Sequence, residues 1–126
     1  MLQITKSKFS EVLFGVGQED IFTLRRDLLA LSEPGGSLSR DCTYDSGIIK
    51  GPERSIEGIV TIRNAEPEGI TKSDDGLVID LDPDSIDLLA GRLELMQRGE
   101  RFPPEVCELT IFRKRKDATL LLVENR

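Results

Sequence analysis

Two amphipathic helices, one in each half of the chain, constrain the fold more than any other feature of this sequence. The second is the clearer, because apolar residues recur at the spacing of a single helical face. These residues are Ile86, Leu89, Ala90, Leu93 and Met96. Asp82 before Pro83 has the composition of a helix start, and Gly99 is typical of a helix end. The pattern predicts a helix over about 83–98.

The first half carries a stripe with the same spacing, and Pro34-Gly35-Gly36 ends it. The apolar residues of this stripe are Ile21, Leu24, Leu28 and Leu31. Each lies 65 residues before its counterpart in the second stripe, as Ile21 does before Ile86. The same offset superimposes Cys42 on Cys107. Short apolar or alternating segments precede and follow both helices, which predicts strands. The expected strands are residues 11–16, 41–44, 55–63, 76–81, 106–112 and 119–124.

We therefore expect one α+β domain over residues 1–126, with a duplicated β-α-β-β unit in halves of about 1–63 and 76–126. The Pro-, Gly- and Asp-rich segment 64–75 would connect the halves. Both helices would pack on one face of an antiparallel or mixed sheet. Strands of opposite halves would pair into one long sheet, or two sheets would pack across a pseudo-twofold axis. Two unrelated amphipathic helices can also be slid into register, so the duplication stays a hypothesis.

Charge and composition narrow the classes of partner. The chain has 17 Lys and Arg against 23 Asp and Glu, a net charge of −6. Such a surface repels phosphate backbones, which disfavours general nucleic-acid and anionic-membrane binding and leaves room for a basic protein partner. No apolar run approaches the length of a membrane span, and the polar start lacks a signal-peptide core, so we expect a cytoplasmic protein.

The absence of histidine removes Ser-His-Asp triads, Cys-His pairs and His-ligated metal sites. Acid–base chemistry would need a tuned carboxylate, lysine, cysteine or Tyr44. No motif for a cofactor is present, so no catalytic or cofactor-binding residue is assigned. Cys42 and Cys107 form no Cys-x-x-Cys motif, and each falls in an expected strand, where a free thiol behaves as a small apolar side chain. Were the duplication real, the two would be symmetry-related, and a redox pair becomes an alternative.

The weak candidates for a metal site are Asp80, Asp82 and Asp84, which have the spacing that opens a calcium loop. The later positions of such a loop fail, because Ser85 stands where Gly is needed and Gly91 where Glu is needed. Helix capping by Asp82 and first-turn placement of Asp84 explain these acids without a metal. We therefore expect no metal site here.

Two segments are candidates for partner binding. The basic run Arg113, Lys114, Arg115 and Lys116 falls between two expected strands, where it is a solvated turn or a phosphate contact. Phe102 and Pro103 follow the second helix, where they form an exposed apolar knob or pack within the chain. The phenylalanines expected in the core are Phe14, Phe22 and Phe112.

These features together favour a non-enzymatic, acidic protein-interaction domain that binds a basic partner or a second copy of itself. Immunity proteins that block cationic toxins offer an analogy of size and charge only. The alternative is a magnesium-dependent hydrolase or small-ligand-binding protein with a pocket between the halves, near Asp41 and Asp45 or Asp80 and Asp82. A third possibility is a nucleic-acid accessory protein acting through residues 113–116.

Overall fold

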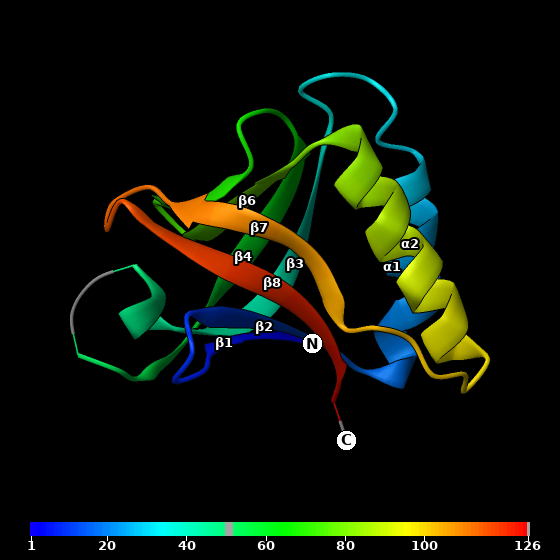
Figure 1. Cartoon of the computed structure of the whole chain (residues 1–126), viewed down its shortest axis with the longest axis horizontal. Helices are drawn as coiled ribbons and strands as arrows, with labels where there is room; N and C mark the ends of the chain where they lie inside the picture. Colours follow the sequence, from blue (N-terminus) through cyan, green and yellow to red (C-terminus); the bar gives the residue numbers. More distant parts are fainter. Residues whose placement is uncertain (50–51, 126) are drawn as a thin grey trace.

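The computed structural model describes residues 1–49 and 52–125, and the strands formed by these residues close into a barrel (Figure 1). The eight strands of the described chain are β1 (Leu2–Lys6), β2 (Glu11–Val16), β3 (Ser37–Asp45), β4 (Ser55–Asn64), β5 (Gly69–Ser73), β6 (Gly76–Leu81), β7 (Glu105–Ile111) and β8 (Lys116–Glu124). The helices are α1 (Gln18–Leu29), α2 (Pro83–Gln97) and the 3₁₀ turn η1 (Ser46–Ile48).

The order of strands around the barrel is β1-β2-β8-β7-β5-β6-β4-β3. Four antiparallel hairpins, β1–β2, β3–β4, β5–β6 and β7–β8, are joined by four parallel pairs, β1–β3, β2–β8, β4–β6 and β5–β7. The odd-numbered strands therefore all run one way and the even-numbered strands the other. The described residues of all four hairpin turns (7–10, 46–49 with 52–54, 74–75 and 112–115) consequently lie at one end of the barrel, which we call the hairpin end.

The two helices lie side by side and pack on the sheet, away from the β1–β2 turn, η1 and the β7–β8 turn, which lie on the left of Figure 1. An ion pair joins the helices, with 3.3 Å between Arg25 Nη2 and Glu94 Oε2. The start of α2 is set locally, because the Asp82 carboxylate accepts a 2.8 Å hydrogen bond from the Ser85 amide. Neither helix in this part of the chain is long and apolar enough to cross a membrane.

The core fills the barrel and extends under the helices as one apolar cluster. Alternate residues of the strands point inward, as Leu2 and Ile4 do on β1 and Leu120 and Leu122 on β8, all at most 1% exposed. The buried faces of both helices join the same cluster. Full burial of each large apolar side chain stabilises the fold by about 1.5–3 kcal/mol.

Six strands and both helices were predicted at positions that overlap the observed ones, and the helix expected over 83–98 is confirmed as Pro83–Gln97. The strand expected at 41–44 was too short, because β3 begins at Ser37. The interpretation of 64–75 as a connector is wrong, because it contains β5. That strand has one strongly apolar side chain, Ile70, and is held by pairing with β6 and β7 on its two sides. β1 was missed as well. Pairing between strands of opposite halves is confirmed by β2–β8 and β4–β6.

Of the three phenylalanines expected in the core, only Phe14 is buried. Phe22 is 61% exposed, because it lies beside the buried stripe of α1 and not on it. Phe112 is 36% exposed, because it follows the last residue of β7 and so leaves the inward alternation of the strand. The prediction was wrong for both residues.

Gly76→Ala tests the close approach of β6 to β4. A Cβ at Gly76 would lie 1.8 Å from the carbonyl oxygen of Ile59, a backbone atom that moves only if the strand pair opens. We expect a loss of at least about 2 kcal/mol in the free energy of unfolding, measured by urea titration and circular dichroism.

The matched control is Gly91→Ala, on the exposed side of α2, where an added Cβ meets no atom within 4 Å. Alanine there is expected to stabilise the protein by about 0.5–1 kcal/mol, since it lowers the entropy cost of forming the helix. Equal urea midpoints for Gly76→Ala and the wild type would contradict the described seam between β4 and β6.

Candidate functional site

The hairpin end is the basic part of an acidic molecule. Of the 15 described lysines and arginines, eight lie in the hairpin turns or within two residues of them, against six acidic residues. Elsewhere the remaining seven basic residues are outnumbered by 17 acidic ones. The basic residues of the hairpin end are Lys6, Lys8, Arg54, Lys72, Arg113, Lys114, Arg115 and Lys116. Basic and acidic residues are mixed along the sequence, but the fold gathers more than half of the described basic residues at the hairpin end.

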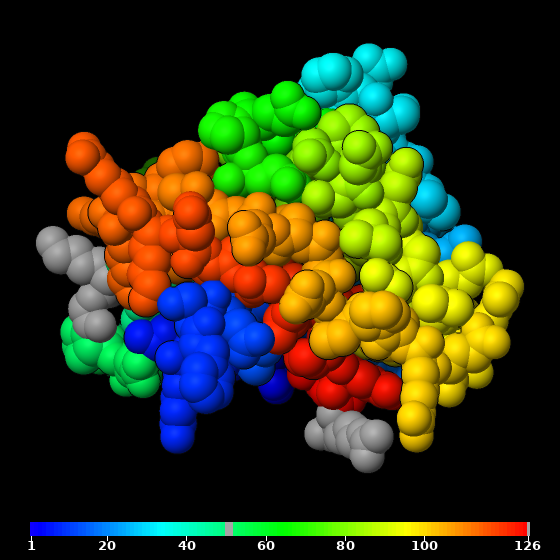
Figure 2. Space-filling model, in the orientation of Figure 1, coloured from blue at the N-terminus to red at the C-terminus, as the bar shows by residue number. Residues whose placement is uncertain are grey.

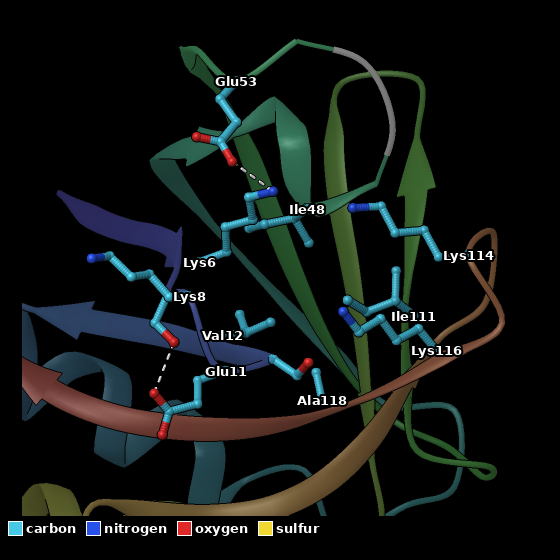
Figure 3. A pocket seen from close by; sticks show the side chains of 12 residues that line it. Lys6, Lys8, Glu11, Val12, Ile48, Glu53, Ile111, Lys114, Lys116 and Ala118 are labelled. Carbon is cyan, nitrogen blue, oxygen red and sulfur yellow. Dashed lines mark hydrogen bonds and ion pairs between the residues drawn. The ribbon is translucent and has the colours of Figure 1, made fainter.

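A pocket of about 310 Å³ opens at this end, between residues of the first and last hairpins (Figure 3). We call it the lysine pocket. Its apolar lining comes from Val12, Ile48, Ile111 and Ala118, all of which are buried. Its charged lining residues are Lys6, Lys8, Glu11, Glu53, Lys114 and Lys116. The pocket thus combines an apolar floor with a mainly cationic rim.

The lysines of the rim point in different directions. Figure 3 shows the amines of Lys6 and Lys114 facing one another across Ile48, whereas the amine of Lys8 points away from the others. Lys6 ends β1 and Lys116 begins β8, so both side chains are anchored on strands. Lys114 lies in the β7–β8 turn, and its amine donates a hydrogen bond to the carbonyl of Gly47. Three amines therefore converge on the pocket.

The charges of these amines are balanced unequally. The Lys6 Nζ lies 2.7 Å from Glu53 Oε1, and this hydrogen bond raises the pKa of Lys6 and lowers that of Glu53. Burial, followed by the like charges of Lys6 and Lys116, lowers the pKa of Lys114. Within the described residues no carboxylate lies in ion-pair distance of Lys114 or Lys116. With four lysines against Glu11 and Glu53, the lining of the pocket therefore carries a net positive charge.

The basic run was considered as one patch, but the structure divides it. Arg113 lines a second hollow of about 400 Å³ with Arg54 and Lys72, whereas Lys114 and Lys116 line the lysine pocket. Arg115 is exposed in the turn, at a φ of 49°. Of the polar segment 50–54, Lys50 and Gly51 lie outside the described residues.

An acidic groove of about 650 Å³ lies on another face of the barrel. It is formed by the β4–β5 connection, the start of α2 and the β7–β8 hairpin, which are green, lime and orange in Figure 2. The residues lining this acidic groove are Glu66, Pro67, Glu68, Asp82, Glu108, Leu109, Thr110 and Asp117. Five carboxylates and no basic side chain line it.

Hydrogen bonds within the chain hold three of the five carboxylates in place. Glu68 Oε2 accepts from the Asp82 amide at 3.3 Å, and Asp82 Oδ1 accepts from the Ser85 amide at 2.8 Å. Asp117 Oδ1 accepts from the hydroxyl of Thr110 at 3.1 Å. The groove thus presents negative charge from side chains whose positions are largely set before a partner arrives.

The three metal-site candidates serve separate structural purposes. Asp80 accepts two hydrogen bonds from Arg63, at 2.8 and 2.9 Å, from the neighbouring position on β4, and this contact raises the pKa of Arg63. Asp82 caps α2, as the sequence predicted, and Asp84 is exposed in the first turn of that helix. In residues 1–49 and 52–125 no group of three acidic or cysteine side chains is placed to hold a metal ion.

Asp41 and Asp45 were expected near a pocket between the halves, but they occupy different settings on β3 and at its end. Asp45 accepts a 2.8 Å hydrogen bond from the Gly47 amide and so caps η1. Asp41 is exposed on β3. A pocket between the halves does exist, but the lysine pocket lacks both Asp41 and Asp45, and its rim is mainly cationic.

Phe102 and Pro103 lie on the connection from α2 to β7, whereas the basic run lies at the hairpin end, beyond the other end of β7. Phe102 is half-buried against the apolar core, and Pro103 lines a shallow hollow with Arg92 and Cys107. The structure therefore does not bring together the two groups of partner-binding candidates. Sequence reasoning missed the contribution of Lys6 and Lys8, whose only signal was the alternation of Leu2 and Ile4 that marks β1.

Comparisons with family models, curated proteins and solved structures find no match for this chain.

The two cysteines are free and lie on opposite sides of the barrel, since β3 and β7 are four strands apart in either direction. Burial, the larger cause in each case, raises the pKa of Cys42 to about 11 and that of Cys107 to about 12. Neither thiol is placed to pair with the other or to act as a nucleophile near neutral pH.

This placement predicts slow thiol chemistry in the folded protein. At pH 8 both cysteines are protonated, so Ellman's reagent should react with them slowly in native buffer and rapidly in guanidinium chloride. Release of the coloured thiolate, followed in both conditions, measures the difference. Fast reaction of either cysteine in the native protein would contradict the described burial.

Proposed function

We propose that this chain is a non-enzymatic interaction protein that binds a basic protein partner at the acidic groove. The observation that carries this proposal is the lining of the groove, which has five carboxylates and no lysine or arginine. The groove is large enough for several basic side chains. Outside the hairpin end the described residues include 17 acidic ones against seven basic ones, and such an excess attracts a cationic partner over long distances.

The hydrogen bonds of Glu68, Asp82 and Asp117 support the same proposal. Carboxylates that are already oriented lose little side-chain entropy when a partner binds, so more of the electrostatic attraction is retained as affinity. Lysine and arginine side chains of a partner would form charge-assisted hydrogen bonds with them, and arginine would do so in a bidentate manner. A loop or helix end rich in arginine is the partner surface that fits best.

We also infer that the two halves are copies of one unit. This unit has an additional first strand, β1 in one half and β5 in the other, which the sequence did not predict. The support is the arrangement of pairs. In each half the first two strands form a hairpin, the first strand pairs in parallel with the third, and the third and fourth form a second hairpin. The equivalent strands β2 and β6 then pair with β8 and β4 of the opposite half.

Two further proposals remain. A cytoplasmic location agrees with two free cysteines that are not paired with each other. A second copy of the chain is the alternative partner.

The hydrolase alternative receives less support, since Asp80 is engaged by Arg63 and Asp82 by the start of α2. We expect Mg²⁺ to leave the melting temperature unchanged, and a saturable rise in a thermal-shift titration would reinstate the alternative.

Three baits test the groove by affinity capture from lysate. These are the tagged wild type, the groove variant Glu68→Gln/Glu108→Gln/Asp117→Asn, and the control Glu57→Gln/Asp87→Asn/Glu100→Gln, whose three exposed acids lie outside the groove. We expect a basic protein on the wild-type and control baits that is lost from the groove variant and released as salt rises. Equal capture by the groove variant and the wild type would contradict the proposal.

A further inference from the structure

We propose that the lysine pocket binds the phosphate monoester group of a small organic molecule, with the apolar part of that molecule lying on the pocket floor. This site is separate from the acidic groove and does not depend on the proposed basic partner. It is built from residues of the first and last hairpins, together with Ile48 of η1 and Glu53.

The direction of the amines gives the position of the anion. Lys6 and Lys114 face one another in Figure 3, and Lys116 lies beside Ile111 below them. The carbonyl of Gly47 accepts a hydrogen bond from Lys114 and so fixes that amine at the rim. An anion between these amines would receive hydrogen bonds from several directions, which suits the three terminal oxygens of a phosphate group.

The count of charges favours a dianion. Four lysines line the pocket together with two carboxylates, Glu11 and Glu53, so the lining carries a net charge of +2. Glu53 pairs with Lys6 at 2.7 Å, whereas neither Lys114 nor Lys116 has a carboxylate within ion-pair distance among the described residues. A phosphate monoester carries about −1.5 to −2 at pH 7, whereas a carboxylate or sulfate ester carries a single charge and would leave part of the repulsion in place.

The electrostatics of Lys114 agree with this geometry. Its pKa is lowered by burial and by the charges of Lys6 and Lys116, while the nearby Asp45 and Glu53 act in the opposite direction. Protonation of the Lys114 amine therefore costs more free energy than protonation of an exposed lysine. A bound dianion would reduce that cost and, by linkage, raise the pKa of Lys114.

The floor and volume of the pocket restrict the rest of the ligand. Ile111 is 6% exposed, Ala118 is 4% exposed and Ile48 is fully buried, so the floor offers a small apolar surface that packing against the core holds in place. The volume of about 310 Å³ is at the small end of ligand sites, which fits a phosphate with one ring or a short chain. The acidic excess over the rest of the molecule disfavours a long polyanion such as RNA.

The probe for this site is phenyl phosphate, with phenyl sulfate as its singly charged counterpart and inorganic phosphate as the ligand without a ring. Isothermal titration calorimetry and amide chemical shifts measure binding to the full chain. We expect saturable binding of phenyl phosphate, with shifts at the amides of residues 6–12, 48 and 111–118. Phenyl sulfate and inorganic phosphate should each bind more weakly.

Lys114→Gln/Lys116→Gln should weaken phenyl phosphate binding by about tenfold or more, since a hydrogen bond to a charged group contributes about that factor. The control Arg54→Gln/Lys72→Gln removes the same charge from the hairpin end, but neither residue lines the pocket. The control should bind as the wild type does, and Lys114→Arg/Lys116→Arg should retain most of the affinity.

Vesicles distinguish a soluble ligand from a lipid headgroup. Sedimentation with phosphatidic acid vesicles, but not with phosphatidylcholine vesicles, in a manner that depends on Lys114 and Lys116 would support the site and assign a lipid source. Phenyl phosphate binding without sedimentation would support a soluble ligand. The proposal is overturned if neither phenyl phosphate nor phosphatidic acid vesicles bind. It is also overturned if the pocket variant and the control variant lose equal phenyl phosphate affinity. The groove variant should keep its phenyl phosphate affinity, which separates this test from that of the basic partner.

Discussion

The closure of the barrel is the constraint on which the rest of the structure depends. Each half by itself is a sheet of four strands with exposed edges, β2 and β4 in the first half and β6 and β8 in the second. Unpaired edges of this kind leave backbone hydrogen-bonding groups unsatisfied and promote aggregation. The parallel pairs β2–β8 and β4–β6 satisfy all four edges at once. Because strand directions alternate around the ring, the same closure gathers the four hairpin turns at one end, where residues far apart in sequence become neighbours.

The elements that could be predicted from the sequence are those determined by nearby residues. The start of α2 depends on Asp82, Pro83 and the stripe that begins at Ile86, all within one or two turns of helix. By contrast, β5 has little strand character of its own and exists because β6 and β7 flank it. Phe22 shows a different limit, since the stripe of α1 places its neighbour Ile21 inward and leaves the larger side chain exposed. Size and apolar character alone do not decide burial.

The same distinction applies to the candidate sites. The capping of α2 by Asp82 needed only local reasoning, and it was predicted correctly. The lysine pocket could not be predicted, because Lys6 and Lys114 are 108 residues apart and meet only when the first and last hairpins become neighbours in the closed barrel. Its floor has the same origin, since Val12 and Ala118 come from adjacent strands of opposite halves. The basic run was visible in the sequence, but its division between two hollows was not.

A single strand helps the molecule to hold clusters of opposite sign. The first two residues of β8 are Lys116 and Asp117, and their side chains leave opposite faces of the strand. Lys116 lines the lysine pocket, whereas Asp117 lines the acidic groove. Each cluster therefore has charge of the other sign close behind it, across the wall of the barrel. That neighbour offsets part of the self-repulsion that collecting like charges creates. Alternation along one strand thus places a cationic pocket beside an anionic groove in a domain of this size.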